Sequence, residues 1–248
     1  MAKPNLALIP ATIGDKVYSI LPSDGVGDFD FTRGTIATRI NAQGLIETVA
    51  SGENRLNYSL LDGKVVGCPN LLLEPARTNS ITYSENFSQW SLGSGLTRTE
   101  NSIISPDGTL NAYKIEKTSQ NYLYLRTTFA VGSKSVMSVF VKKGNYRYIG
   151  IRNNADSHNV FDFDTKSFVN IQSNHNVSFV EYPNDWFRLI DVRTISSNTS
   201  AFRGVALTKA DGVEISPDIP LNAFNYVWGA QLEVGDFSYP TSYIKTNG

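Results

Sequence analysis

Two short segments combine tyrosine and arginine in a regular pattern. In Tyr122-Leu-Tyr-Leu-Arg126 and Tyr146-Arg-Tyr-Ile-Gly-Ile-Arg152, tyrosine and the final arginine alternate with leucine or isoleucine. Because successive side chains of a β-strand point to opposite faces, the leucines and isoleucines predict a core-facing side and the other residues an opposite row. The two rows would consist of Tyr122, Tyr124, Arg126, Tyr146, Tyr148 and Arg152.

Rows of this kind suit a ligand with both apolar faces and hydroxyl edges. A tyrosine offers a flat ring with a hydroxyl, and an arginine offers a planar fork of hydrogen-bond donors. Glycans have apolar C–H faces and hydroxyl edges, so glycan binding is one interpretation. A protein partner is a second, because tyrosine and arginine are enriched at interface hot spots. In a third, the tyrosines only form cross-strand pairs that stabilise a sheet.

Carboxylates are the other residues whose spacing could support chemistry. Asp162 and Asp164 alternate with two phenylalanines, and a pair of carboxylates is what a glycan-cleaving enzyme needs. The same pattern also fits a half-buried strand that enters a hairpin at residues 164–167, and we favour this interpretation. A glycine-rich loop offers carboxylate oxygens to calcium, although its spacing matches no complete calcium signature. We expect no cofactor, with calcium as the alternative at Asp24, Asp28 and Asp30.

The remaining reactive residue types lack partners in the sequence. His158 and His175 have no third metal ligand nearby, and we expect both on the surface or in loops. Cys68 precedes a proline and is expected to be a small buried apolar residue. No serine lies in a nucleophile-elbow pattern, and no glycine loop precedes a helix to bind phosphate. The sequence therefore predicts a binding or structural protein without catalytic residues, not an enzyme.

Composition restricts the class of protein further. The chain has 248 residues, of which 41% are apolar and 18% are charged, and its net charge is −1. Nucleic-acid binding needs a concentrated cationic face, which the sequence lacks. There is no apolar stretch long enough for a signal peptide or a membrane span, and a single cysteine cannot form an intrachain disulfide. We therefore expect folding in a reducing cytoplasm, without membrane contact.

Almost every patterned segment has a period of two residues, which is typical of β-strands. Residues 135–142, 187–192 and 222–232 predict long, largely buried strands, and glycine- and asparagine-rich turns separate such runs. Strands at intervals of about ten residues predict an all-β fold with an antiparallel β-sandwich of the jelly-roll type. Trp228 and Leu232 are expected in the core of this sandwich.

The first 79 residues differ from the rest of the chain. They contain short strand candidates and few long apolar runs, with a hairpin turn at residues 41–44. Such a stretch buries little apolar surface by itself, so we expect it to lie against a partner or against copies of itself. The predicted organisation is a β-rich attachment and oligomerisation arm, residues 1–79, followed by a jelly-roll sandwich, residues 80–248.

Three groups of motifs together resemble a known class of proteins. The first group is Leu45-Ile-Glu-Thr-Val49, Asn54-Arg-Leu-Asn-Tyr58 and Cys68-Pro-Asn-Leu-Leu-Leu-Glu-Pro-Ala-Arg-Thr-Asn79. The second is Asn86-Phe-Ser-Gln-Trp90, Pro106-Asp-Gly108 and Ala112-Tyr-Lys-Ile115. The third is Asp185-Trp-Phe-Arg188, Tyr226-Val-Trp-Gly-Ala-Gln-Leu-Glu233 and Tyr239-Pro-Thr-Ser-Tyr-Ile244. Most of the chain thereby resembles phage virion proteins of the fibre and decoration type, in which an LLLEPxRTN linker precedes a jelly roll similar to carbohydrate-binding modules.

The resemblance implies a virion protein that is made in the cytoplasm of a bacterial host. Our leading hypothesis is a head or tail fibre or decoration protein whose arm binds other virion proteins and self-associates as a trimer, and whose sandwich binds host-surface glycans. Glu74 and Arg77 of the linker are expected to tie the arm to the sandwich through charge-assisted hydrogen bonds. Two alternatives stay open: a purely structural virion or capsid-associated protein with no ligand, and a polysaccharide depolymerase that uses Asp162 and Asp164.

Overall fold

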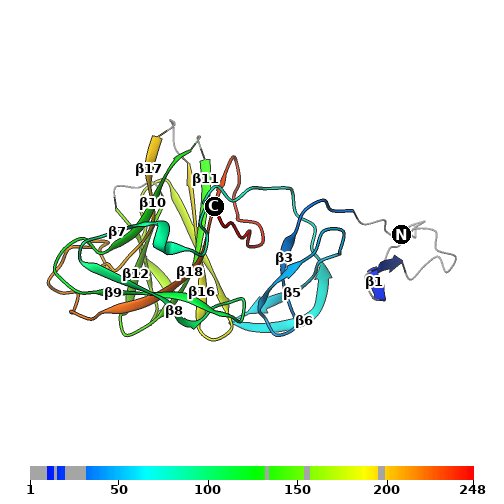
Figure 1. Ribbon diagram of the computed structural model, residues 1–248, viewed down its shortest axis with the longest axis horizontal. Helices are drawn as coiled ribbons and strands as arrows, with labels where there is room; N and C mark the ends of the chain where they lie inside the picture. Colours follow the sequence, from blue (N-terminus) through cyan, green and yellow to red (C-terminus); the bar gives the residue numbers. More distant parts are fainter. Residues whose placement is uncertain (1–9, 14–15, 20–31, 132–133, 154–156, 195–198) are drawn as a thin grey trace, which may run out of the picture.

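The chain folds as an all-β protein, as predicted. The computed structural model describes residues 10–13, 16–19, 32–131, 134–153, 157–194 and 199–248. Strands in these ranges form two large antiparallel sheets and three two-stranded hairpins (Figure 1). No helix in the described ranges has the length and apolar character needed to cross a membrane.

The two large sheets each contain six strands. Sheet 1 has the order β14-β13-β12-β17-β10-β7 and consists of β7 (Ser91–Leu92), β10 (Tyr124–Val131), β12 (Tyr148–Asn153), β13 (Asn159–Asp162), β14 (Ser167–Asn170) and β17 (Thr199–Ala206). Sheet 2 has the order β15-β16-β11-β18-β9-β8 and consists of β8 (Leu96–Ile104), β9 (Leu110–Lys117), β11 (Lys134–Lys143), β15 (His175–Tyr182), β16 (Trp186–Thr194) and β18 (Phe224–Val234). Successive strands from β9 to β12 lie alternately in sheet 2 and sheet 1, and so do the strands from β16 to β18. Within each sheet, the later strands pair with the earlier ones: β16 and β18 with β11, and β17 with β10 and β12. This interleaving is that of a jelly roll.

Smaller elements precede the sandwich strands. The N-terminal hairpins are β1 (Pro10–Ile13) with β2 (Lys16–Ser19), β3 (Ala37–Ile40) with β4 (Ile46–Val49), and β5 (Leu56–Leu61) with β6 (Lys64–Leu71). A 3-10 turn, η1 (Phe87–Gln89), leads into β7. The predicted hairpin turn at residues 41–44 is confirmed, because it joins β3 to β4.

The main core fills the space between sheet 1 and sheet 2. The three long strands expected from the sequence are present as β11, β16 and β18. Inward side chains of both sheets form one buried cluster, which includes Leu125, Ile151, Leu189 and Leu232. Burying a side chain of this size contributes about 1.5–3 kcal/mol, so this cluster is what holds the two sheets together.

A second core lies on the outer face of sheet 2. Trp228 is as deeply buried as Leu232, but its ring points away from the main core and packs against Phe140 and Tyr243, at centroid distances of 5.2 and 4.8 Å. A β-bulge in β18 produces this orientation, with Gly229 at a φ of 56°. A Cβ atom at Gly229 would lie 3.1 Å from the Phe140 ring, so a side chain there would be both crowded and strained.

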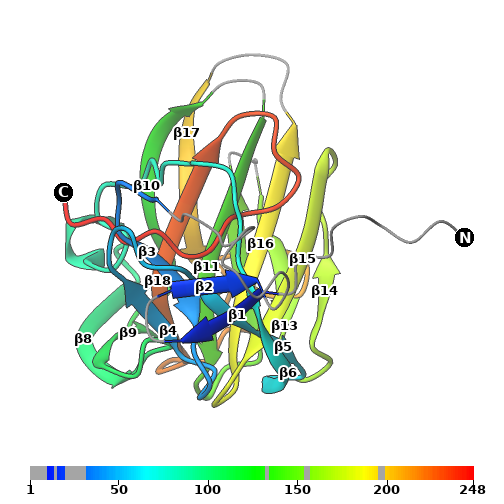
Figure 2. The same ribbon diagram turned by 90° about the vertical axis from the view of Figure 1, so that its right-hand side faces the viewer.

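The arm covers the second core. Ile46 of β4 is buried in it, and Ile40 and Leu60 pack against it. Figure 2, viewed from the side of the arm, shows β3 to β6 in front of the strands of sheet 2. The arm therefore buries apolar surface against the sandwich of its own chain, a contact that its expected role against a partner did not include.

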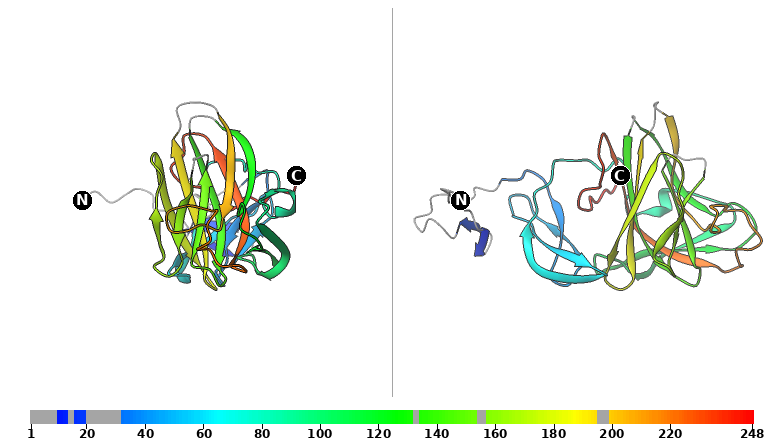
Figure 3. Two further views of the ribbon diagram at one scale, coloured as in Figure 1. Left: turned by 90° about the vertical axis from the view of Figure 1, so that its left-hand side faces the viewer. Right: turned by 180° about the vertical axis from the view of Figure 1, so that it is seen from behind.

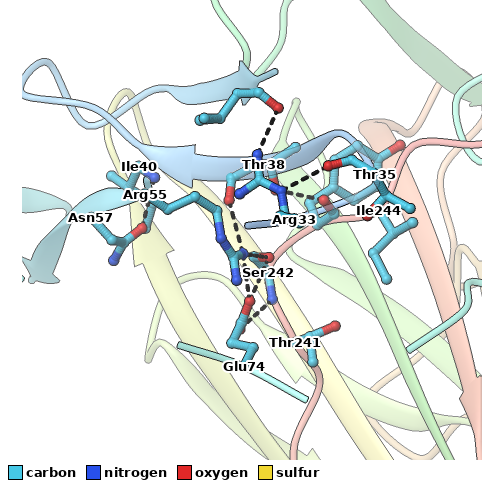
Figure 4. A network of polar contacts seen from close by, with 12 residues as sticks. Arg33, Thr35, Thr38, Ile40, Arg55, Asn57, Glu74, Thr241, Ser242 and Ile244 are labelled. Atoms are coloured by element: carbon cyan, nitrogen blue, oxygen red, sulfur yellow. Dashed lines mark hydrogen bonds and ion pairs between the residues drawn. The ribbon is translucent and has the colours of Figure 1, made fainter. Parts of the chain in front are cut away.

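A polar network reinforces the contact between arm and sandwich (Figure 4). Nη1 of Arg55 donates to Oε2 of Glu74 at 2.7 Å and to Oγ of Ser242 at 2.8 Å. The backbone N–H of Ser242 donates to the other carboxylate oxygen of Glu74 at 2.7 Å. The predicted role of Glu74 in tying the arm to the sandwich is confirmed by these bonds.

Arg77, the second linker residue, reaches the last strand of the sandwich. Its Nη1 donates to Oε2 of Glu233 at 2.6 Å, and its guanidinium lies 3.7 Å from the ring centroid of Phe237. The side-chain amide of Asn79 donates to the carbonyls of Ala230 and Ile244. The predicted tie through Arg77 is also confirmed. The exact domain boundary at residue 79 stays a prediction.

The C-terminal tail, residues 235–248, also takes part in the contact between the arm and the sandwich, which we call the joint. Thr38 of β3 donates its hydroxyl to the carbonyl of Tyr243 at 2.5 Å, while Tyr243 also packs on Trp228. Figure 3 shows the tail in red, running between the arm and the sandwich. The LLLEPARTN linker and the segment from residue 226 to residue 244 therefore meet in one structural unit.

Truncating Trp228 tests the second core. Trp228→Ala should lower the free energy of unfolding by about 3–5 kcal/mol, because it leaves a large cavity between the arm and sheet 2. Leu221→Ala is the control: its side chain is 63% exposed, and a change within about 0.5 kcal/mol is expected. Urea unfolding of the full chain measures both variants. Equal stabilities would show that the arm does not cover Trp228.

Candidate functional site

The two Tyr/Arg segments lie close together in one sheet. β10 and β12 both pair with β17, which runs between them in sheet 1. In this register Arg126, Gly204 and Arg152 form one row across the three strands, and Tyr124 pairs with Ala206 in the next row. A strand from a much later part of the chain therefore unites the two segments into one surface.

Alternation places this surface on the outer face of sheet 1, as predicted. Leu123 and Leu125 of the first segment are fully buried in the main core, and so are Ile149 and Ile151 of the second. The outer face of sheet 1 is the side of the sandwich away from the arm, which covers sheet 2 (Figure 1). We name the outward side chains here the Tyr/Arg face: Tyr122, Tyr124, Arg126, Tyr148, Arg152 and Phe202.

Aromatic rings hold Arg126 in place at the centre of the Tyr/Arg face. Its guanidinium carbon lies 3.6 Å from the ring centroid of Tyr124 and 3.4 Å from that of Phe202. The guanidinium of Arg152 lies 5.5 Å from the same Phe202 ring. Tyr122 extends the aromatic surface, at 5.9 Å from Tyr124, and is 49% exposed. Cation–π contacts of this kind orient the charged groups before any ligand arrives.

Small residues form the floor beneath these side chains. A Cβ atom at Gly204 would lie 2.1 Å from the carbonyl oxygen of Leu125, so no larger residue fits between the two arginines. A Cβ atom at Gly150 would lie 2.7 Å from Cβ of His158 and 2.8 Å from Cγ2 of Thr208. His158 and Thr208 therefore pack directly on the backbone of β12, and β10 and β17 approach each other closely at Gly204.

His158 and Glu214 border the Tyr/Arg face. Nε2 of His158 lies 3.8 Å from Oε2 of Glu214, and its Nδ1 lies 3.3 Å from the carbonyl oxygen of Gly212. A carbonyl can only accept, so Nδ1 is the atom that carries the proton of the neutral ring. Burial and the positive charge of Arg152 lower the pKa of His158 to about 4. At neutral pH this histidine is therefore uncharged.

Glu214 lies within the influence of both arginines of the Tyr/Arg face. Burial raises the pKa of Glu214, and the positive charges of Arg152 and Arg126 oppose this shift. Oε2 of Glu214 and Nε of Arg126 are both buried without a hydrogen-bond partner in the described part of the chain. These two atoms are therefore polar groups that the described part of the fold does not satisfy.

Tyr146 belongs to the fold and not to the exposed row. It precedes β12, and its ring packs against the main core. Its hydroxyl donates to the carbonyl of Thr208 at 2.9 Å, and burial raises its pKa to about 12. Tyr148 contacts its ring at a centroid distance of 6.1 Å, so Tyr146 supports the edge of the Tyr/Arg face from below.

Asp162 and Asp164 lie in the predicted hairpin. β13 and β14 pair across residues 163–166, which confirms the hairpin. Arg147 donates from Nε and Nη2 to both carboxylate oxygens of Asp162, at 2.9 and 2.7 Å. These bonds lower the pKa of Asp162 to about 2, and Lys143 forms an ion pair with Asp164. A carboxylate held ionised in this way cannot donate a proton near neutral pH, as a glycosidase acid must.

The expectation of a surface or loop position is wrong for His175, which begins β15 (His175–Tyr182) with a side chain that is 1% exposed. His158 does lie in a loop, directly before β13, but it is only 4% exposed. Nδ1 of His175 lies 2.7 Å from Oδ1 of Asp191, whose carboxylate also accepts from Asn159 at 2.7 Å. Cys68 is exposed on β6 instead of buried, because that strand of the arm hairpin lies largely in solvent.

Sequence reasoning missed Phe202, Gly204, His158 and Glu214 as parts of the site. The alternation of Phe202, Gly204 and Ala206 was the available signal. It is hard to recognise because Arg203 between them is a charged residue at a buried, inward-facing position. The calcium candidates Asp24, Asp28 and Asp30 lie outside the described residues. Among the residues described, no three histidine, cysteine, aspartate or glutamate side chains are grouped to hold a metal ion.

Comparisons with known proteins do not add to this geometry. No family model matches the chain, and no curated protein matches it either. The chemistry of the Tyr/Arg face is therefore argued from its own side chains.

The ion pair of Asp162 predicts a pH dependence of stability. Its pKa is about 2 in the folded protein, against an ordinary value of 3.8, so its ionisation stabilises the fold above about pH 4. This stabilisation is lost as the pH falls towards 2. Asp162→Asn should therefore lower the free energy of unfolding at pH 6, and the difference from the parent chain should shrink towards pH 2. Urea unfolding at several pH values measures this, and a difference independent of pH would contradict it.

Proposed function

We propose that this chain is a phage virion structural protein, of the head or tail fibre or decoration type, that displays a glycan-binding β-sandwich. One observation carries the proposal: the two outer faces of the sandwich have different surroundings. The arm and the tail cover the outer face of sheet 2, whereas the Tyr/Arg face occupies the outer face of sheet 1 (Figure 1). In this proposal the side that attaches and the side that is displayed are opposite sides of one folded unit.

The arrangement of the motifs supports the virion assignment. Several of the residues on which the resemblance to fibre and decoration proteins rests join the arm to the sandwich. Glu74, Arg77 and Asn79 of the linker bond to Ser242, Glu233 and the neighbouring backbone. Proteins that hold a displayed domain on a particle need such a joint, because force on the domain must pass to the arm.

Exposed apolar residues on the arm support its role in attachment. The side chains of Ile36, Leu61, Val66 and Leu73 are between 38% and 71% exposed. Apolar surface that the fold leaves open is a common feature of sites that bind other proteins. We propose that other virion proteins and further copies of the chain cover this surface, with a trimer as the simplest assembly.

The chemistry of the Tyr/Arg face supports glycan binding over a bare structural role. Its rings can pack on the C–H faces of a sugar, while guanidinium groups and Glu214 can bond hydroxyl groups. Preformed geometry also favours a ligand, since the rings fix Arg126 in advance. In the competing role, as a contact between subunits without a ligand, the same face would be covered in the particle.

Glycan binding is tested with the purified full chain on an array of bacterial surface glycans, followed by calorimetry. Tyr122→Ala should weaken binding about five- to tenfold, because truncating an aromatic contact costs on the order of 1 kcal/mol. Tyr239→Ala is the matched control, since this exposed tyrosine lies on the tail, away from sheet 1. Absence of binding to every glycan at millimolar concentration would favour the structural role without a ligand.

Cys68 provides a test of the attachment side. Its thiol is exposed on the arm in the free chain, and we expect a maleimide reagent to modify it readily. In purified particles Cys68 should be protected, whereas Tyr122→Cys in a Cys68→Ser background should stay reactive. Mass spectrometry of the labelled peptides measures both. Equal labelling of the two positions in particles, or the absence of the chain from particles, would contradict the proposal.

A further inference from the structure

A small pocket lies in the joint, between the arm and the outer face of sheet 2. Its volume is about 180 Å³, and its lining comes from the arm and linker, from strands β15 and β16, and from the tail. Ile40, Asn57, Glu74 and Ser242 of this lining are labelled in Figure 4. A cavity of about 150 Å³ can hold a molecule of the size of benzene, so this space, which we name the joint pocket, has room for a small ligand.

Arg188 of β16 brings a positive charge to the joint pocket. Its neighbours Phe187 and Leu189 face the main core, so alternation places Arg188 on the outer face of sheet 2, where it lines the pocket. Its Nε and Nη2 atoms both donate to Oγ of Ser138, at 3.1 and 3.0 Å. The residue is 6% exposed, and no carboxylate of the described ranges forms an ion pair with it. A neutral hydroxyl is therefore the acceptor of a buried charged group.

The other charged side chains of the lining are already paired with each other's neighbours. Glu74 forms an ion pair with Arg55 at 2.7 Å, and Arg39 forms one with Glu47 at 3.3 Å. Neither pair includes Arg188. A buried charge is costly unless an opposite charge accompanies it. The joint pocket therefore carries a positive charge that the described part of the fold does not pair.

Tyr182 of β15 also lines the joint pocket and does not supply the missing negative charge. Burial raises the pKa of its hydroxyl, and the positive charge of Arg188 opposes this rise. The hydroxyl is thus neutral near pH 7 and keeps its proton. Apolar side chains complete the lining, among them Ile40, Ile46 and Leu72. The chemistry of the pocket is that of one buried cation beside an apolar wall.

We infer that the joint pocket binds a carboxylate group on a short apolar stem, and that Arg188 is its partner. A guanidinium fork matches the two oxygens of a carboxylate, while the stem packs on the apolar wall. This site is separate from the Tyr/Arg face and goes beyond the function proposed above. Because both the arm and the sandwich line the pocket, its occupation stabilises the contact between them.

The test measures thermal unfolding of the full chain with added propionate, followed by calorimetry for the dissociation constant. Propionate at about ten times this constant should raise the melting temperature by about 3–6 °C. Propionamide has the same shape without the charge and should bind at least tenfold more weakly. Sodium chloride at equal ionic strength is the control for general salt effects.

Two variants connect the effect to the joint pocket. Arg188→Met should weaken propionate binding at least tenfold, and without ligand its melting temperature should equal or exceed that of the parent chain, because an unpaired buried charge is removed. Leu72→Trp fills the pocket, keeps Arg188, and should also abolish the response to propionate. Lys64→Met is the matched control, since it removes a positive charge from the exposed β6 and should leave the response unchanged.

Two sources offer this ligand chemistry: a free small carboxylate and the glutamate side chain of a partner protein. N-acetylglutamate amide carries the same group on a protein-like backbone. Binding as tight as that of propionate would identify the side chain as the source, and weaker binding would identify the free carboxylate.

Three results would overturn the inference. Equal stabilisation by propionate, propionamide and sodium chloride would remove the carboxylate class. An equal response of the parent chain and Arg188→Met would remove the pocket as the site. No response to propionate at 100 times the concentration of the chain or above, up to about 0.1 M, would show that the pocket takes no carboxylate. None of these results depends on glycan binding by the Tyr/Arg face.

Discussion

The buried carboxylate of Glu233 is the interaction on which the arrangement of the molecule depends. It accepts hydrogen bonds from Arg77 of the linker and from both the N–H and the hydroxyl of Thr241 in the tail. A charge with no solvent exposure is tolerated only when such partners are present, so linker, last strand and tail must stay together. This joint holds the arm over the outer face of sheet 2, and it leaves the outer face of sheet 1 for other contacts.

The outer faces of both sheets carry an arginine beside aromatic rings, but the two arginines differ in their hydrogen bonds. On sheet 2, the guanidinium of Arg188 lies 5.4 Å from the ring of Phe140, which packs on Trp228, and it donates a hydrogen bond to Ser138. The arm and the tail cover that group. On sheet 1, the guanidinium of Arg126 also lies on an aromatic ring, but its Nε has no hydrogen-bond partner among the described residues. This contrast between an arginine with a bonded Nε and one without is the reason why we propose the outer face of sheet 1, and not that of sheet 2, as the glycan-binding face.

Much of the architecture could be predicted from alternation, because the side on which a residue lies is a local property of a strand. Leu125 and Ile151 point inward for that reason, and the outward rows followed. The neighbour of a strand is not a local property, so the sequence could not show that β17 joins the two rows or that a loop brings Glu214 to them. The bulge at Gly229, which turns Trp228 towards the arm, is likewise a feature of pairing. Cys68 and His175 were wrongly placed because burial depends on what covers a strand.

The central claim is that one sheet of the sandwich supports the arm while the other binds the ligand. Hydrogen–deuterium exchange of the full chain, with and without a saturating glycan, tests this division directly. The account predicts slower exchange at residues 122–128, 148–152 and 202–214, with no change at residues 38–74 and 239–246. Slower exchange confined to the arm and the tail would place the ligand on the opposite side of the sandwich and contradict the account.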